Sequence, residues 1–477
     1  MTSYVAASEQ CFKEQFLGQS DFQAKPLSVG GTEYRLYYYE TMVDSSLVQD
    51  FILKPLLARP SDPVREVVSI LDYTETEHME EAFEAIVHGK TVLHREGESR
   101  YYLLGADLKK GRSINIPTNE RILRGSNEAF IENIDTNLNL MRKLIPSTDL
   151  VVNSYSLGRL SKTKVAVMYI KSVANLCFLE ELDRRLQSID IDYLDAPGFL
   201  DELVRETKFS LFPQLLITER TDRARSYLME GKIVVVTSGS PDSIVLPVTF
   251  WSFFQSPDDY HISWLLGSFY RLLRLVCFLL TIGLPAFYVS VSSYNPQLLP
   301  INFANTLQSS LKYVTFPPIF ETIAMMLLLE ILREATVRLA SPVGQAIGVV
   351  GGIVVGTVVV QSNLASNTMV IVAAMTGLAS FIIPSYEMSS AVRLLSYPAV
   401  LLSSFLGLFG LVIFFMMIVI YLCQMSMMGQ PYFTPPFALS EFKDTLIRSP
   451  IWNLRQRPDQ TAPRNRMRLR HPRSWKK

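Results

Sequence analysis

Residues able to carry out metal or nucleophilic chemistry are few in this sequence and poorly spaced. Three histidines lie close to an acidic run: His78, His88, His94 and Glu75, Glu77, Glu80, Glu81, Glu84. Their spacing fits no standard ligand pattern, so a solvated helix face is favoured over a metal site. The four cysteines are at least 100 residues apart and include no C-x-x-C pair. A zinc knuckle or a disulfide framework is therefore not predicted.

Sequence motifs of the common enzyme classes are also missing. The chain has no phosphate-binding Walker loop, no dinucleotide-binding G-x-G-x-x-G after a strand and no G-x-S-x-G nucleophile elbow. We therefore predict that the protein is not an enzyme, with no catalytic residue, no metal and no cofactor.

Charged residues within an apolar helical pattern are the most informative chemical feature. Segment 316–339 is apolar except for Glu321, Glu330, Arg333, Glu334 and Arg338. Helical spacing places Glu330, Glu334 and Arg338 on one face, with Arg333 three residues from Glu330. A charge facing lipid costs at least a few kcal/mol, so this helix must lie at the interface or turn that face to protein or water. An ion-pair ladder serving assembly and a face lining an aqueous path both remain open.

A glycine stripe follows directly in the sequence. Gly344, Gly348, Gly352 and Gly356 recur every four residues, which lets a second backbone approach one helix face closely. Packing within the monomer and self-association into an oligomer are both open. If several copies pack through the stripe, Val354, Thr357, Val358 and Gln361 line a narrow apolar constriction that gates by dewetting.

The elements that position these residues are membrane helices. Only ten of the 164 residues in 265–428 are charged, and uncharged runs of 48 and 47 residues follow Arg338 and Arg393. A membrane span requires about 20 apolar residues. We predict an all-α polytopic membrane domain of four to five helical segments over 265–428, the last two at about 368–383 and 394–423. The number of crossings stays open.

The formal net charge of zero conceals three regions of different sign. Residues 1–264 carry 28 basic and 38 acidic groups, 265–440 carry 6 and 4, and 441–477 carry 11 and 3. No signal peptide pattern opens the chain, and the basic tail over 429–477 favours a cytoplasmic C-terminus. We predict a multi-pass protein of the cell membrane with both termini in the cytoplasm. The overall balance does not favour nucleic acid as a partner.

A weak internal repeat organises the acidic region. Segment 82–105 and the segment beginning 142 residues later both show a helical stretch, a Gly-Lys pair, a β-rich strand, a glycine turn and a second strand. We predict two similar cytoplasmic α/β lobes, over 1–150 and 151–264. Whether a ligand binds between them is open.

Several motifs resemble those of the A subunit of spore germination nutrient receptors, the GerA (GerABKA-type) family, over about residues 80–458. They are Phe212-Pro213-Gln214, Thr218-Glu219-Arg220, Phe253 to Tyr260, Glu330 to Glu334, Pro342-x-Gly344-Gln345, Ile383 to Tyr386, Gly429-x-Pro431-Tyr432, Lys443-Asp444 and Arg448-x-Pro450. The sequence departs from the family pattern at Thr221 and Ser126, where prolines are usual.

The resemblance implies a germinant receptor subunit in the spore inner membrane. Its implied partners are a transporter-like B subunit, thought to bind the nutrient, and a lipoprotein C subunit. It also implies a homo-oligomeric ring in the lipid bilayer that forms a ligand-gated ion channel. The alternative is a non-conducting scaffold or signalling subunit that anchors the nutrient-binding subunit. Secondary transport is disfavoured because no inverted repeat of broken helices is visible.

Overall fold

The computed structural model describes residues 10–60, 62–108, 117, 120, 122, 124–195, 197–339, 341–434 and 444–469. They form two compact units. The first, here called the α/β unit, comprises the described residues of 1–206, 215–248 and 454–477. The second, called the helical unit, comprises those of 207–214 and 249–453.

The first lobe of the α/β unit is an antiparallel sheet of five strands in the order β1-β2-β4-β5-β3. These strands are β1 Phe22–Val29, β2 Thr32–Tyr39, β4 Thr91–Arg95, β5 Tyr101–Leu104 and β3 Tyr73–Thr76. Both faces of the sheet are covered. Leu36 and Leu93 pack on the side of η1 (Val48–Leu53), whereas Tyr37 and Val92 pack on the side of α5 (Met79–Val87). Short helices α2 Ser45–Leu47, α3 Lys54–Ala58 and α4 Val64–Val67 complete the lobe.

The second lobe repeats this architecture with the strand order β6-β7-β9-β10-β8. Its strands are β6 Leu150–Leu157, β7 Thr163–Ile170, β9 Ile233–Thr237, β10 Ser243–Leu246 and β8 Leu216–Thr218. Its helices are α6 Ile134–Leu144, α7 Leu176–Gln187, α8 Pro197–Val204 and α9 Thr221–Met229. The predicted pair of similar α/β lobes is therefore confirmed.

Glycines end the equivalent helices and turn the equivalent hairpins in both lobes. Gly89 after α5 and Gly231 after α9 have φ of 86° and 93°. Gly97 and Gly239, in the β4–β5 and β9–β10 turns, have φ of 93° and 91°. This left-handed region is open to glycine and costly for most other residues. The repeated glycines therefore place each hairpin at the same point after its helix.

A buried ion pair joins the two lobes. Arg142 in α6 donates two hydrogen bonds to the carboxylate of Asp21, next to β1, and its guanidinium lies 3.7 Å from the centre of the Tyr39 ring. Both charged side chains are at most 5% exposed. Burial also raises the pKa of Tyr39 above its usual value, which keeps the phenol neutral beside Asp21. Since a bidentate pair fixes orientation as well as distance, this contact orients α6 against the first lobe.

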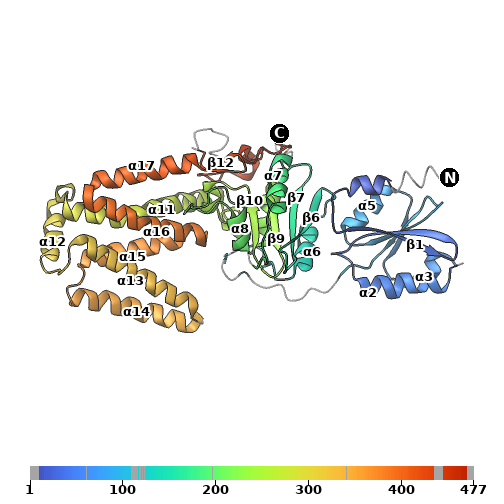
Figure 1. Cartoon of the computed structure of the whole chain (residues 1–477), viewed down its shortest axis with the longest axis horizontal. Helices are drawn as coiled ribbons and strands as arrows, with labels where there is room; N and C mark the ends of the chain where they lie inside the picture. The colour runs from blue at the N-terminus through green and yellow to red at the C-terminus, as the bar shows by residue number, and fades with distance from the viewer. Residues whose placement is uncertain are drawn as a thin grey trace. The chain divides into compact units, whose positions relative to one another are not determined.

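Seven helices of 11 or more residues, α11 to α17, build the described part of the helical unit, and they are labelled in Figure 1. Helix α11 spans Trp264–Ser293 after η2 (Phe250–Phe254) and the short α10 (Asp258–His261). The others are α12 Ile301–Leu311, α13 Pro318–Arg338, α14 Ser341–Gln361, α15 Asn367–Ile382, α16 Tyr386–Leu406 and α17 Leu408–Gln424. Minor elements are η3 Pro296–Leu298, β11 Ser426–Met427, β12 Gln430–Pro431 and η4 Ile451–Asn453.

Contacts between helices define two ends of this bundle. At the end where α11 begins, called the entry end, Phe212 packs on both Phe250 and Tyr421 near the end of α17. At the far end, Tyr294 donates to the carbonyl of Ser404, and the Thr315 amide donates to Asn363. Helix α12 lies at the far end (Figure 1), and the other six helices from α11 to α17 run between the two ends. The chain therefore enters and leaves the bundle at the same end.

The prediction of one helical segment over 394–423 is wrong. It is divided between α16 and α17, because Gly407 has φ 61° and ψ −143° and ends α16. A Cβ at this position would lie 3.2 Å from Oδ1 of Asn295 and 3.3 Å from Cβ of Tyr294. Only glycine combines this backbone conformation with so little space, so α17 turns back along the bundle here.

The break predicts the effect of Gly407→Ala. The substitution should lower the free energy of unfolding by about 1–3 kcal/mol, the cost of one strained backbone conformation, and lower the melting temperature of the purified protein in detergent. The matched control is Gly377→Ala within α15, where the added methyl would lie 3.9 Å from Leu329. Equal melting temperatures for the two variants would contradict this account of the turn.

Candidate functional site

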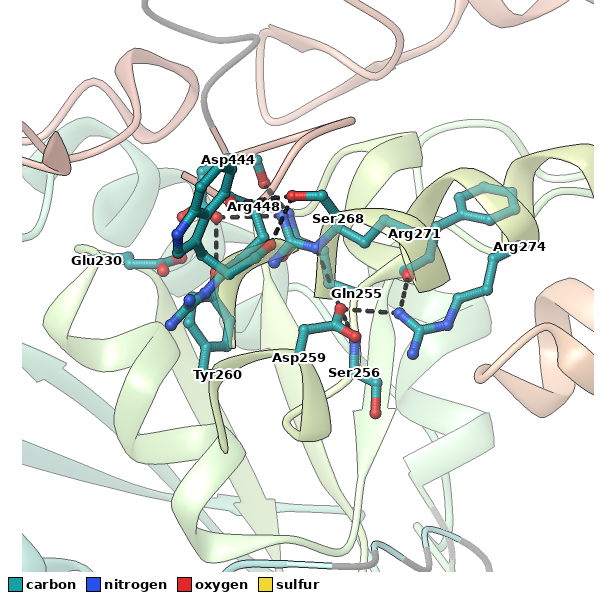
Figure 2. Close-up of polar contacts among 12 residues, drawn as sticks. Glu230, Gln255, Ser256, Asp259, Tyr260, Ser268, Arg271, Arg274, Asp444 and Arg448 are labelled. Carbon is teal, nitrogen blue, oxygen red and sulfur yellow. Dashed lines mark hydrogen bonds and ion pairs between the residues drawn. The ribbon is translucent and has the colours of Figure 1, made fainter. Parts of the chain in front are cut away.

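A cluster of buried charges lies at the entry end of the helical unit (Figure 2). It consists of Asp259 and Tyr260 from α10, Arg271 and Arg274 from α11, and Asp444 from the segment that follows α17. We call these five residues the junction cluster. It joins segments that are more than 170 residues apart in sequence.

Asp259 is the centre of this cluster. Its side chain is fully buried, and its Oδ2 accepts from Nε of Arg271 at 3.1 Å and from Nη1 of Arg274 at 2.8 Å. The backbone amide of Ser256 donates to the same oxygen at 3.2 Å. The two arginines are three residues apart in a helix, so both reach one carboxylate placed beside the first turns of α11.

Asp444 completes the arrangement from the other side. Nη1 of Arg271 donates to its backbone carbonyl at 2.6 Å and to its Oδ1 at 3.1 Å. The hydroxyl of Tyr260 donates to the same Oδ1 at 2.9 Å. The amide nitrogen of Gln255 also donates to the Asp444 carbonyl at 2.8 Å. The segment after α17 is thus held at the beginning of α11.

The electrostatic balance of the junction cluster suits a structural joint rather than catalysis. Two carboxylates neutralise two guanidinium groups, and each arginine forms an ion pair with at least one of the carboxylates. Oδ1 of Asp259 and Nη2 of Arg271 are buried with no hydrogen-bond partner in the described part of the chain, so desolvation remains partly uncompensated. A buried pair of this kind tolerates loss of one partner poorly, because the other charge remains in a low dielectric.

A second buried polar group lies nearer the far end. Glu321 in the first turn of α13 is 1% exposed. Its Oε1 accepts from the backbone amide and the hydroxyl of Ser366, both at 2.7 Å, while Tyr288 of α11 lies within 3.3 Å. Ser366 is the N-cap of α15. The carboxylate therefore joins three helices and occupies the positive end of the α15 dipole, which favours a negative group.

The other charges of α13 form ion pairs towards the entry end. Glu334 pairs with the exposed Arg338 at 2.6 Å, four residues away. Glu330 lies 3.7 Å from Arg333 and 3.2 Å from Arg393 in α16. Nη2 of Arg333 also donates to the Ser380 hydroxyl of α15 at 2.8 Å. The charged face thus contains both an intrahelical pair and contacts to neighbouring helices.

The glycine stripe of α14 is divided between two environments. A Cβ at Gly344 would lie 2.9 Å from the Thr336 carbonyl of α13, and one at Gly348 would lie 3.7 Å from the Thr336 side chain. A Cβ at Gly352 or Gly356 would meet nothing within 4 Å. One half of the stripe therefore packs within the chain, and the other half faces open space.

The predicted gate residues lie on this outer half. Thr357, Val358 and Gln361 are exposed, with Val358 48% exposed, and the Thr357 hydroxyl donates to the Ile353 carbonyl. The side chain of Val354 lies outside the described residues. Val358 and Gln361 therefore lie on the surface of the helical unit.

Three histidines, His78, His88 and His94, were considered as metal ligands, and none belongs to a possible metal site among the described residues. His94 lies in β4, where its Nε2 is 3.0 Å from the Glu98 carbonyl and burial lowers the pKa of the ring. Among the described residues, no group of three or more His, Cys, Asp or Glu is arranged to hold a metal ion.

The junction cluster was only partly visible in the sequence. Arg271 and Arg274 mark the start of the first apolar helix, and Asp259 and Asp444 belong to family motifs. Nothing local indicates that Asp444 reaches Arg271. Likewise, Glu321 was predicted as a functional charge, whereas its partners Tyr288 and Ser366 were missed. A serine directly before an apolar helix is the one signal that identifies Ser366 as a cap.

The cluster predicts a large effect for Asp259→Asn. The substitution leaves Arg271 and Arg274 buried without their shared carboxylate, which should cost about 3–5 kcal/mol of unfolding free energy. Thermal unfolding in detergent, followed by circular dichroism, measures this loss. The control is Glu334→Gln, which removes an exposed pair worth at most about 1 kcal/mol. Equal stability of the two variants would rule out a central role for Asp259.

Comparison with known proteins identifies relatives along nearly the whole chain. The model of the Bacillus/Clostridium GerA spore germination protein family matches residues 10–460. Spore germination protein A1 of Bacillus subtilis (strain 168) is 34% identical over 434 residues, which cover 90% of each chain. Spore germination protein B1 of the same organism is 33% identical over 444 residues, covering 91% of this chain and 92% of the relative.

One solved structure also resembles the chain. The crystal structure of the N-terminal domain of the A subunit of the Bacillus megaterium spore germinant receptor GerK3 covers 51% of this chain and 94% of its own, at 24% identity and a TM-score of 0.38. The resemblance predicted from the motifs is confirmed by the family match. This chain belongs to the GerA family of spore germination proteins.

Proposed function

We propose that this protein is a membrane subunit of a nutrient germinant receptor and triggers spore germination by oligomerising into a ligand-gated ion channel. The family match and the names of the relatives support the germination role. The division of the α14 glycine stripe is the observation that carries the channel proposal, because a Cβ at Gly352 or Gly356 would meet nothing within 4 Å among the described residues and Val358 is 48% exposed.

Membrane insertion is supported by the apolar helices. Among the described residues, two helices, Trp264–Ser293 and Tyr386–Leu406, are long and apolar enough to cross a bilayer. Asn367–Ile382 and Leu408–Gln424 are shorter apolar helices, close to the lower limit of about 17 residues for a span. In our proposal these helices cross together with α13 and α14, and the protein is multi-pass. Glu321 of α13 is buried inside the bundle, whereas the Glu334–Arg338 pair is exposed towards the end of α13.

Charge asymmetry between the two ends of the bundle supports cytoplasmic termini. Near the entry end lie Arg271, Arg274, Arg333, Arg338, Arg393 and Arg448, whereas Lys312 lies near the far end. Basic residues concentrate on the cytoplasmic side of membrane proteins. We therefore place the entry end, and with it both termini, on the cytoplasmic side of the spore inner membrane.

The proposed pore forms where α14 helices of several copies meet. Gly352 and Gly356 allow close approach of a second backbone, and Val358 then contributes to a ring of apolar side chains. Such a ring closes by excluding water, and a shift in helix packing opens it. A transporter-like B subunit and a lipoprotein C subunit are the proposed partners that supply the nutrient signal.

The second candidate function is a non-conducting scaffold that anchors the nutrient-binding subunit. The packing of α14 against α13 favours it. A Cβ at Gly344 of the stripe would lie 2.9 Å from the Thr336 carbonyl, and one at Gly351, next to the stripe, would lie 2.6 Å from Leu332. Flux of monovalent cations from liposomes containing the purified protein distinguishes the two candidates. A channel conducts, at least in a small open fraction, and a scaffold does not.

Oligomerisation through α14 predicts the effect of Gly356→Leu. The isobutyl group would occupy the space that a second backbone needs, so the oligomer should dissociate in mild detergent while the monomer remains folded. Mass measurement by light scattering gives the oligomeric state. The control is Met416→Leu at an exposed position of α17. An oligomer of unchanged mass in Gly356→Leu would exclude this face as the interface.

The gate predicts increased leak for Val358→Ala. A wider and less apolar constriction should dewet less readily, and a barrier lowered by about 1.4 kcal/mol raises cation flux about tenfold. The matched control is Val412→Ala in α17, since Val412 is 49% exposed and Val358 is 48% exposed. Equal flux through liposomes containing the two folded variants would eliminate Val358 as a gate.

A further inference from the structure

The segment Asp444–Leu469, here called the C-terminal strap, is anchored in both units. Its residues up to Asn453 belong to the helical unit, and those from Leu454 belong to the α/β unit. The chain also passes between the units after Glu206, Gln214 and Val248. The strap is therefore a further covalent connection, lying far in sequence from the other three.

The first anchor of the strap holds the beginning of α11. Asp444 accepts hydrogen bonds from Arg271 and Tyr260, and the hydroxyl of Ser268 donates to the Arg448 carbonyl at 3.1 Å. The Arg448 side chain is buried, with its guanidinium 5.6 Å from the centre of the Tyr260 ring. Backbone, charged and aromatic contacts thus attach this part of the strap to the first turns of α11.

The second anchor holds the turn between α9 and β9. Nε of Arg457 donates to the Met229 carbonyl at 2.8 Å, and the buried Thr461 hydroxyl donates to the Glu230 carbonyl at 2.9 Å. The backbone amide of Arg464 donates to the Val173 carbonyl at 2.9 Å. The strap also folds back on itself, since the amide of Arg468 donates to the Arg455 carbonyl at 2.8 Å.

The connection between the two anchors is short. Arg457 lies nine positions after Arg448, so the two Cα atoms are at most about 30 Å apart when the chain between them is fully extended. Pro450 and the turn at Ile451–Asn453 shorten this path, because the Asn453 amide donates to the Pro450 carbonyl at 2.8 Å. The covalent path through the strap therefore sets a short upper limit on the separation of the two anchors.

We propose that the C-terminal strap is a coupling element that transmits displacement of the second α/β lobe to the first turns of α11. The helix receives this displacement through Arg271 and Ser268, at the entry end of the bundle. Movement of the lobe therefore biases the position of α11, against which α15 and α16 pack. Because its test measures germination, this proposal rests on the proposed function.

The test lengthens the strap without removing a contact. About eight Gly and Ser residues are inserted between Asn453 and Leu454, which adds about 15 Å of flexible reach and leaves both anchors intact. The matched control carries the same insertion after Leu469, beyond the second anchor. Spores with wild-type protein, either insertion or no copy of the chain are exposed to a dilution series of an equimolar mixture of the twenty amino acids, glucose and inosine. Germination rate, protein abundance and melting temperature are measured.

If the strap couples the lobe to α11, the insertion after Asn453 raises the half-maximal nutrient concentration by about fivefold or more, which corresponds to a typical coupling free energy. The abundance and the melting temperature of the protein should stay normal. The control insertion should match wild type. An unchanged response, or a weaker response explained by an equal loss of protein, would overturn the strap proposal. Normal germination of spores without the chain would instead contradict the proposed function, so the two failures are distinguishable.

Discussion

The carboxylate of Asp259 holds two arginines of α11 in a site from which water is excluded, and the helical unit is organised around this contact. Two positive charges at the start of an apolar helix require a counter-ion that is equally buried. Asp259 supplies it from α10, and Asp444 adds a second acid from beyond α17. The first helix and the segment after the last one therefore meet at the entry end, where the α/β unit connects to the bundle through the chain.

Similar reasoning applies to the α/β unit, where duplication supplies the scaffold and one ion pair orients it. Each lobe buries both faces of a five-stranded sheet, so neither needs the other to complete its core. Arg142 and Asp21 join the lobes through a bidentate pair that specifies a single orientation. This contact therefore fixes how the two lobes of the α/β unit are oriented to each other.

The charges of α13 show how an apolar bundle accommodates polar groups. Glu321 is satisfied by the cap of α15, while Glu330 and Arg333 find partners on α15 and α16. These contacts use part of the charged face within the chain. The outer half of α14, by contrast, has exposed glycine and valine positions, and it is the face on which the channel and scaffold proposals differ.

Local sequence determined the elements of this protein. Glycine spacing predicted the repeated hairpins, charge depletion predicted the helical region, and family motifs identified the relatives. Helical periodicity likewise placed Glu334 and Arg338 on one helix face, and they form an ion pair there because they are four residues apart. Tertiary structure alone decided that Asp444 reaches Arg271, that Ser366 caps α15 beside Glu321, and that Gly407 divides the last apolar segment. These contacts depend on which distant segments pack together, since burial and hydrogen-bond satisfaction are properties of the folded chain and leave no periodic signal in sequence.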